Sequence, residues 1–519
     1  MKPRRIVAGL VLAALAIAGC STQSGSETTT ASAAGSGAST GPAGPSGVLN
    51  VGVPLDATTF NPHMSVMGPM MTYLTPLYDV LIRRTADGSL VPAVATKWEY
   101  TDADSLHLQL SIRDGVVFDD GSALDAAAVK KNIEDARDTK GPFSNGLAAV
   151  QSVDVGQGTV TLNLSERVPN LENTLAGPAG MLVQPSALGT DTLASKPAGS
   201  GAYVLDPTSV AGSTYVLSAR DGYWDQAAYG PKTLNLLVLS DTDARLNALV
   251  SGQVDATVAF VQQAETAKAA GLSIVSNPLN FYAIGLLDRS GTMVPALADK
   301  RVRQALNFAV DRDAVVAALT FGYGEPSTQM FDSESPAFSK AANDFYTYDP
   351  DKAKALLKEA GFGDGLTIPV FAEARFGPYL EAVDGFLRAV GVTLDITLAD
   401  SGQIAAWSSG KYPAPLVTFG SNDPLSMIQT WALPDSPNNP FHTELPGIDD
   451  MTAKISAAKT PEELNAAYQQ VSEAVTEEGW FLTTHILDTL YAFNPAKVDG
   501  IEAYSGNSVP YVYGWTVKS

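Results

Sequence analysis

The stretch DKRVRQALNFAVDRDAVVAALTFGYG, residues 299–324, predicts two short helices in succession. Asp299 suits a helix N-cap, and apolar residues then recur at the i, i+3, i+4, i+7 and i+8 spacing of one helix face. Asp311 suits a second N-cap, and the helix that it opens ends at Gly322 and Gly324. On physical grounds alone, this pair of helices predicts only part of a packed core.

The residues that follow alternate between helix and strand patterns. We expect helices at residues 351–360, 379–390 and 464–476, and strands at residues 366–371 and 392–398. Such a βαβ order predicts a parallel sheet in an α/β domain. Nearer the N-terminus we expect strands at residues 48–53 and 106–112, two more within residues 150–164, and a helix over residues 70–81.

The N-terminus resembles a bacterial export signal. Three basic residues precede an apolar run, residues 6–19, which is shorter than the roughly 20 residues that span a bilayer. Residues 17–20, Ile-Ala-Gly-Cys, resemble a lipobox. This resemblance implies that Cys20 is lipidated and becomes the mature N-terminus. An ordinary cleaved signal with an incidental cysteine is the alternative.

The composition narrows the classes of function. Residues 21–47 are almost all Ser, Thr, Gly, Ala and Pro and predict a flexible tether. Cys20 is the only cysteine, which excludes disulfides within the chain. The net charge is −22, from 33 basic and 55 acidic residues. This acidic balance argues against nucleic acid as a partner, because phosphate binding requires a basic surface.

Several stretches, in chain order, resemble motifs of the large extracytoplasmic solute-binding proteins of ABC importers, the dipeptide-, oligopeptide- and nickel-binding family. Residues 299–312 match its D-x-R-V-R-x-A-ϕ-x-x-A-ϕ-D-R pattern. Further matches lie at residues 90–128, 197–203, 220–224 and 245–255. The departures include Asn61 for a turn aspartate, Asp119 for histidine or serine, and Ala128 for aspartate.

The resemblance implies an α/β protein with the periplasmic-binding-protein type II fold: two lobes with a hinge, and three domains. We expect a lipoprotein signal at residues 1–20 and a tether at 21–47. Domain I is then discontinuous, domain II is inserted into it, and domain III forms the second lobe. The expected boundaries are 48–81, 197–275 and 486–519 for domain I, 82–196 for domain II and 276–485 for domain III.

A search for catalytic motifs gives no convincing candidate. The sequence has no G-x-S-x-G, H-E-x-x-H or P-loop motif. Residues 408–411 satisfy S-x-x-K, but the partner motifs S-D-N and K-T-G are absent. The four histidines are too dispersed for a dedicated metal site. We therefore expect no enzyme activity, cofactor or metal, and keep a tethered extracellular hydrolase as the alternative.

A cleft that grips solutes should present aromatic faces and a few polar groups on irregular segments. The resemblance suggests eleven positions for this pocket, for each of which core packing or loop anchoring is the alternative. These positions are Val66, Met67, Gly68, Phe260, Phe281, Tyr282, Trp407, Phe419, Gly420, Ser421 and Asn422.

Residues 419–424 bear on the ligand class. Peptide binders of the family carry W-x-x-D-Y here, with the aspartate holding the α-ammonium group of the peptide. In this chain Phe419 takes the place of the tryptophan and Asn422 that of the aspartate, although Asp423 could substitute. An ammonium group without a carboxylate loses a charge-assisted hydrogen bond. The sequence thus favours a neutral or aromatic solute, a glycoside or a blocked peptide.

The resulting hypothesis is a monomeric, lipid-anchored receptor on the outer face of the cell membrane. It would capture a small solute between two closing lobes and present it to an ABC permease served by cytoplasmic ATPases. A receptor that senses or scaffolds without transport is a further alternative.

Overall fold

The computed structural model describes residues 45–420 and 423–518. The expected signal, Cys20, most of the tether, Ser421 and Asn422 lie outside the described residues. Within the described ranges, none of the helices combines the length and the hydrophobicity needed to cross a bilayer.

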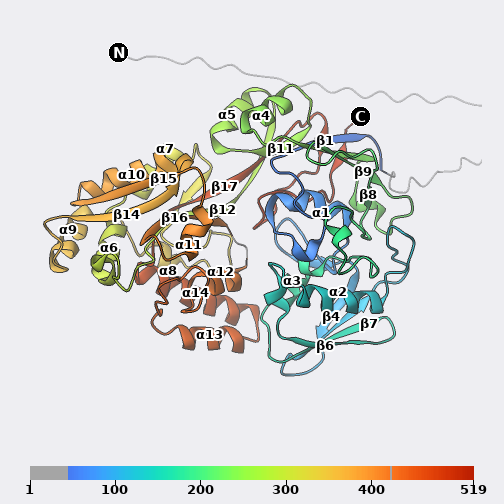
Figure 1. The fold of residues 1–519 in the computed structure, drawn as a ribbon, viewed down its shortest axis with the longest axis horizontal. Helices are drawn as coiled ribbons and strands as arrows, with labels where there is room; N and C mark the ends of the chain where they lie inside the picture. The colour runs from blue at the N-terminus through green and yellow to red at the C-terminus, as the bar shows by residue number, and fades with distance from the viewer. Residues whose placement is uncertain (1–44, 421–422, 519) are drawn as a thin grey trace, which may run out of the picture. The chain divides into compact units, whose positions relative to one another are not determined.

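One mixed sheet runs through both lobes, and two of its strands are shared between them (Figure 1). These strands, β12 (Ser273–Gly285) and β17 (Phe481–Phe493), pair antiparallel along their whole length. One end of β17 pairs with β11 (Ala256–Ala259), a strand of the first lobe. The opposite end of β12 pairs with β16 (Ala414–Gly420), a strand of the second lobe. Between these pairings, β12 and β17 connect the lobes.

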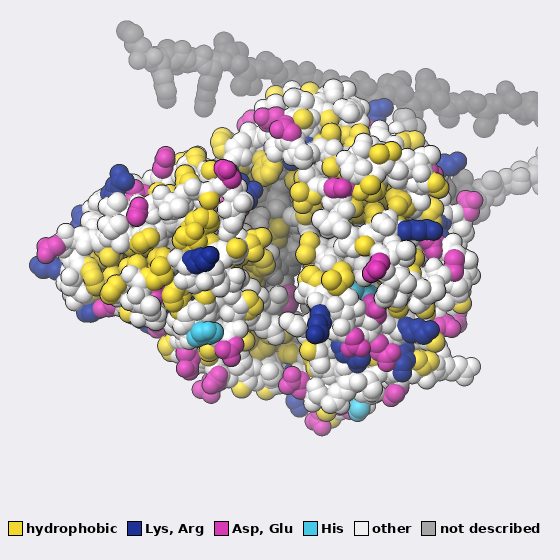
Figure 2. Space-filling model, in the orientation of Figure 1, with side chains coloured by type: hydrophobic (Ala, Val, Ile, Leu, Met, Phe, Trp, Pro, Cys, Tyr) yellow, Lys and Arg dark blue, Asp and Glu magenta, His cyan; other side chains and the backbone are white. Residues whose placement is uncertain are grey.

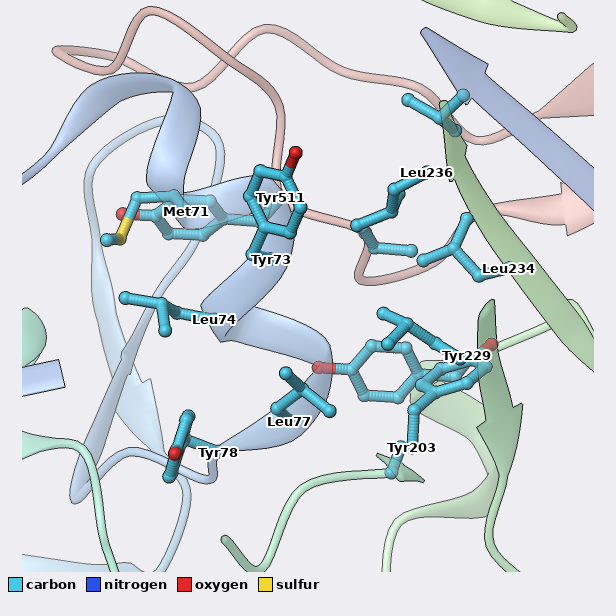
Figure 3. Packing of buried hydrophobic residues seen from close by; sticks show 14 of the residues in the cluster. Met71, Tyr73, Leu74, Leu77, Tyr78, Tyr203, Tyr229, Leu234, Leu236 and Tyr511 are labelled. Atoms are coloured by element: carbon cyan, nitrogen blue, oxygen red, sulfur yellow. The ribbon is translucent and has the colours of Figure 1, made fainter. Parts of the chain in front are cut away.

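The first-lobe part of the sheet has the strand order β11-β1-β10-β9-β8. Its remaining elements are β1 (Val48–Val53), β8 (Tyr203–Leu205), β9 (Thr214–Ala219), β10 (Thr233–Val238), α1 (Met71–Leu77), α4 (Thr242–Val250) and α5 (Ala264–Ala269). The core between α1 and the sheet is rich in tyrosine, and Figure 3 shows these rings among leucines of β10 and α1. Several of the buried hydroxyls find an acceptor: Tyr78 donates to the carbonyl oxygen of Phe60 at 2.7 Å, and Tyr203 to that of Pro231 at 2.6 Å.

A second, four-stranded antiparallel sheet belongs to the chain between α1 and β8, with the order β4-β5-β7-β6. Its strands are β4 (Ala95–Tyr100), β5 (His107–Ile112), β6 (Val150–Val155) and β7 (Thr159–Leu164), and α2 (Ala126–Asp138) and α3 (Leu171–Leu175) accompany them. A short hairpin of β2 (Ile82–Arg84) and β3 (Leu90–Pro92) leads into this sheet. These elements have a hydrophobic core of their own, which supports an inserted domain; its exact boundaries stay a prediction.

The second-lobe part of the sheet has the order β15-β14-β16-β12-β17, in which β14 (Leu366–Glu373) pairs parallel with both β15 (Val392–Ala399) and β16. The parallel sheet predicted from the βαβ pattern is therefore confirmed. Its helices are α6 (Lys300–Phe308), α7 (Arg312–Leu319), α8 (Lys340–Asn343), α9 (Pro350–Glu359), α10 (Gly377–Arg388), α11 (Gln403–Ser408), α12 (Pro424–Trp431), α13 (Ile448–Ala457) and α14 (Pro461–Glu477). The short strands β13 (Gly324–Pro326), β18 (Val498–Asp499) and β19 (Thr516–Val517) complete the set.

The two N-caps predicted in residues 299–324 are confirmed. The Asp299 carboxylate accepts from the amide of Arg301, and the Asp311 carboxylate accepts from the amide of Ala314. The single helix expected over residues 70–81 is wrong at its C-terminal end, because α1 stops at Leu77. The chain beyond it enters extended pairing instead: the amide of Leu81 donates to the carbonyl oxygen of Gly180 at 2.9 Å.

Arg312, at the start of α7, links the helical pair to the sheet. Its guanidinium donates to the carbonyl oxygens of Ser327 at 3.1 Å and Thr483 at 2.8 Å. It also donates to the backbone and side-chain oxygens of Asn307, at 3.0 and 2.8 Å. Burial lowers the pKa of Arg312 to about 10, so the group remains charged at neutral pH. All four acceptors lose their donor if this side chain is removed.

We expect Arg312→Met to lower the free energy of unfolding by about 3–5 kcal/mol, because buried carbonyl groups would lose their partners. Chemical denaturation followed by circular dichroism measures this change. Arg301→Met is the matched control, because Arg301 lies on the neighbouring helix in an exposed pair with Asp299. The control should unfold almost as the wild type does; equal stability of the two variants would contradict the role given to Arg312.

Candidate solute-binding site

The connection between the lobes contains a backbone irregularity and a side-chain clamp. The pairing of β12 with β17 shifts register between Pro278 and Asn280. Just before this shift, the Asn277 amide donates to the carbonyl oxygen of Tyr504 at 3.1 Å. The hydroxyl of Thr489 on β17 donates to the Asn277 side-chain oxygen, also at 3.1 Å. Asn277 therefore ties both connecting strands to the C-terminal segment of the first lobe.

The predicted loop at residues 66–68 lies beside this connection. Gly68 has a φ of +81°, and a Cβ atom there would lie 3.1 Å from the Ser508 hydroxyl. Ser508 lines a small cavity together with Asn277 and Tyr491. Val66 is 53% exposed, whereas Met67 packs against the first-lobe core. The loop thus places one exposed apolar side chain close to the hinge.

Three of the predicted aromatic residues meet in one cluster of the second lobe. Trp407 packs against Phe419 and Trp431 at ring-centroid distances of 6.0 and 5.5 Å. Phe281 packs edge-on against Trp431 at 6.5 Å. The indole of Trp407 donates to the carbonyl oxygen of Leu416 at 2.8 Å. Phe281 and Trp407 are only 1% and 4% exposed, which favours their alternative role as core residues.

Phe419 and Gly420 form the accessible end of this cluster, because both are half-buried. They end β16, and a Cβ atom on Gly420 would lie 2.6 Å from the Leu279 side chain. Sequence reasoning missed Trp431, which contacts both Phe281 and Phe419. Trp431 lies on an apolar helical stretch, and in the sequence such a stretch looks the same whether its residues line a binding site or pack in the core.

Tyr282 is not part of this cluster. Adjacent residues of a strand point to opposite faces, so Tyr282 lies on the other side of the sheet from Phe281. Its ring stacks on His485 at 4.6 Å and meets Tyr379 edge-on at 5.6 Å. Phe260, the remaining predicted residue, is 48% exposed and directly follows β11 in the first lobe. The structure therefore does not bring Phe260 or Tyr282 to the aromatic cluster.

Asp423 serves as the N-cap of α12. Its carboxylate accepts from the amide of Ser426 at 3.0 Å. Burial raises the pKa of this carboxyl, while the nearby backbone amides and the Arg84 guanidinium of the first lobe lower it. Asp423 thus already has a structural task, and its electrostatic neighbour belongs to the opposite lobe.

A pocket that the sequence did not reveal lies between α1, the β2–β3 hairpin and the C-terminal segment of the first lobe. The pocket is small, and its walls include Met71, Arg83, Arg84, Tyr511 and Tyr513. Figure 3 shows the ring of Tyr511 alongside Met71. The Arg-Arg doublet and the Tyr-x-Tyr spacing were visible signals, but nothing in the sequence joins two segments so distant in the chain.

The molecular surface is hollowed between elements of the two lobes, and hydrophobic side chains lie on both rims of this hollow (Figure 2). Within residues 45–420 and 423–518, no group of three or more His, Cys, Asp or Glu side chains could hold a metal ion. The rims of this hollow therefore present mainly hydrophobic side chains to a ligand.

Two lobes joined by two shared strands define the class of fold to which the protein belongs. Solved structures agree with this class. The substrate-binding protein CtaP from Listeria monocytogenes superposes with a TM-score of 0.80 at 21% identity, covering 92% of this chain and 100% of that one. NikA from Brucella suis, in complex with Fe(III)-EDTA, gives 0.79 at 23% identity, covering 91% and 100%. The expected periplasmic-binding-protein type II fold is confirmed.

Sequence comparisons identify the family. The sequence model of the bacterial extracellular solute-binding proteins, family 5, matches residues 89–439. The glutathione-binding protein GsiB of Salmonella typhimurium is 27% identical over 455 residues, which cover 82% of this chain and 86% of the relative. This chain belongs to the bacterial extracellular solute-binding proteins of family 5. The resemblance found in its motifs is thereby confirmed.

The buried histidine of the second lobe makes stability depend on pH. His485 is 2% exposed, and its burial lowers its pKa from 6.5 to about 4. Between these values the unfolded chain binds a proton that the folded protein excludes, so stability falls as the pH falls. We expect a loss on the order of 1–2 kcal/mol between about pH 7 and pH 5 from this group.

His485→Phe should keep the ring stacking and flatten this part of the pH profile, as measured by thermal unfolding at several pH values. The control is His442→Gln, since the His442 side chain is 71% exposed. A profile as steep in His485→Phe as in the wild type would contradict the assignment.

Proposed function

We propose that this protein is the lipid-anchored receptor of an ABC importer, which captures a small organic solute between its lobes and presents it to the permease. The observation that carries the proposal is the pair of shared strands: a change of angle at the hinge moves one lobe against the other without breaking either core. A solute that contacts both lobes only in the closed form shifts the equilibrium between open and closed forms toward the closed one. A solute that makes the same contacts in the open and the closed form does not shift this equilibrium.

Family relatives support a peptide-like solute. GsiB is a glutathione-binding protein, and the DppA structure of Helicobacter pylori, with a TM-score of 0.76 at 18% identity, contains the peptide STSA. The exposed Val66 and the half-buried Phe419 and Gly420 are the residues that we assign to solute contact. Asn422, in place of the amine-binding aspartate of the family, favours a solute without a free amine. Protein monomers would act at the outer face of the cell membrane, with the permease and its ATPases as partners.

We expect compounds that co-purify with the protein to compact it and to be released unchanged. Small-angle scattering with and without the compound measures the closure, and mass spectrometry of the recovered compound measures turnover.

N-acetylated dipeptides should raise the melting temperature more than the same dipeptides with free amines. Phe419→Ala should weaken binding, while Phe345→Ala, another partly exposed ring of the second lobe, should not.

Conversion of the captured compound would support the hydrolase instead of the receptor. A better response to free-amine dipeptides would overturn the interpretation of Asn422 but leave solute capture intact.

We expect Cys20→Ser to move the protein from the membrane fraction to the soluble extracellular fraction, because serine lacks the thiol that carries the lipid. Cell fractionation with immunoblotting measures this distribution. The same fractionation of Ser21→Ala is the control and should match the wild type. A membrane fraction unchanged by Cys20→Ser would contradict the lipid anchor.

A further inference from the structure

The two lobes also contact each other away from the strands that connect them. Arg167, in the inserted domain between β7 and α3, donates to the backbone carbonyl oxygen of Ser456 at 3.4 Å. Ser456 lies in the last turn of α13 in the second lobe. Figure 1 shows α13 well away from β12 and β17. Because a rotation about the hinge separates distant groups the most, a small opening of the lobes breaks this hydrogen bond.

Arg167 suits this contact because it is a charged donor at the end of a helix. The last carbonyl groups of an α-helix have no amide partner within the helix and carry a partial negative charge. Arg167 is also held within its own domain. Burial raises the pKa of the Glu172 carboxyl on α3, and the Arg167 guanidinium lowers it. The half-buried Arg167 therefore extends from beside α3 to the C-terminus of α13.

Asn170, at the N-cap of α3, has a side chain that is not used for capping. A capping asparagine ordinarily accepts a hydrogen bond from an amide of the first helical turn. In the described part of the chain the Asn170 side chain makes no such bond, and its backbone is left-handed, with a φ of 58° and a ψ of 36°. Residues other than glycine rarely adopt this conformation. The Asn170 side chain is thus available to a partner outside its own helix.

A partner of the right chemistry lies in the second lobe. Tyr468 of α14 is fully buried, and among the residues that the structure describes its hydroxyl has no hydrogen-bond partner. Burial and then the Asp423 carboxylate raise the pKa of this hydroxyl, whereas the Asn170 side chain lowers it. Asn170 therefore lies near the Tyr468 hydroxyl without bonding to it. A buried hydroxyl without a partner is destabilising, so a hydrogen bond from the opposite lobe would stabilise the closed form.

We propose that these residues form an interlobe latch, in which Arg167 and Asn170 of the inserted domain close onto the Ser456 carbonyl and the Tyr468 hydroxyl. The latch sets the equilibrium between open and closed forms without contacting the solute. This inference rests on the proposed solute capture and adds what sets its affinity. The apparent affinity scales with the fraction of the protein in the binding-competent form, so the latch tunes the affinity for every solute alike.

The first test follows closure without any solute. Nitroxide labels at Asp104→Cys and Lys354→Cys, exposed positions of the inserted domain and the second lobe, report the interlobe distance by double electron–electron resonance. The full chain carries Cys20→Ser, so that only these two sites are labelled. The protein without the latch variants should populate both forms, and Arg167→Gln should lower the ratio of closed to open forms about three- to tenfold. Arg301→Gln, which removes the same charge from an exposed pair on α6, should leave the distances unchanged.

The second test measures coupling between the lobes. Asn170→Gly keeps the left-handed backbone and removes the side-chain amide, and Tyr468→Phe removes only the hydroxyl. Each variant should lower the ratio of closed to open forms by a similar factor, and the double variant should lower it no further, because one hydrogen bond is lost in all three. Tyr468→Phe should not lower the melting temperature, since its hydroxyl has no partner within its own lobe.

The outcomes separate the latch from the proposed function. Circular dichroism establishes that each variant folds. Additive effects of Asn170→Gly and Tyr468→Phe, or label distances unchanged in Arg167→Gln, overturn the latch. A co-purified solute should bind Arg167→Gln more weakly, in proportion to the loss of the closed form; unchanged affinity also overturns the latch, while capture by the wild type stands. A solute that binds without changing the label distances overturns capture by closure instead, and the latch is then judged by the solute-free distances.

Discussion

The antiparallel pairing of β12 with β17 is the constraint on which the rest of the structure depends. Both strands continue from one lobe into the other, and each lobe adds further strands only at one end of the pair. The sheet is therefore wide inside each lobe and narrow between them. Bending is least costly where the fewest ladder hydrogen bonds must change, and the register shift after Pro278 lies in this narrow part. The hinge is thus located by strand pairing rather than by a flexible linker.

Buried arginines hold the second lobe to these strands. Arg303 donates to the carbonyl oxygens of Glu478 and Leu297, both at 2.9 Å, and Arg312 donates to that of Thr483 on β17. Each guanidinium donates to backbone carbonyl groups of separate segments of the chain. This use explains why residues 299–324, which look like an ordinary helical pair, contain such specific polar positions.

Local chemistry made much of the fold predictable from the sequence. Asp299 and Asp311 act on amides two or three residues away, so their capping roles follow from short patterns. The site was less accessible to this reasoning. Strand alternation shows that Phe281 and Tyr282 face opposite sides, but it does not show which side is core, and Phe281 lies in the core. The pocket of Arg84 and Tyr511 joins residues from near the two ends of the chain, a proximity that only the tertiary fold creates.

The order of the strands along the chain also determines when each strand can find its partners during synthesis on the ribosome. Residues of β1 are made early, yet they wait for β10 and β11 before they have strand partners on both sides. Residues made much later matter equally. β17 pairs with strands of both lobes, and Trp515 is fully buried in the first lobe. Neither lobe can be finished before β17 has been made. A nascent chain therefore exposes unpaired strand edges until β17 emerges, and chaperones that cover such edges would protect it from aggregation during this period.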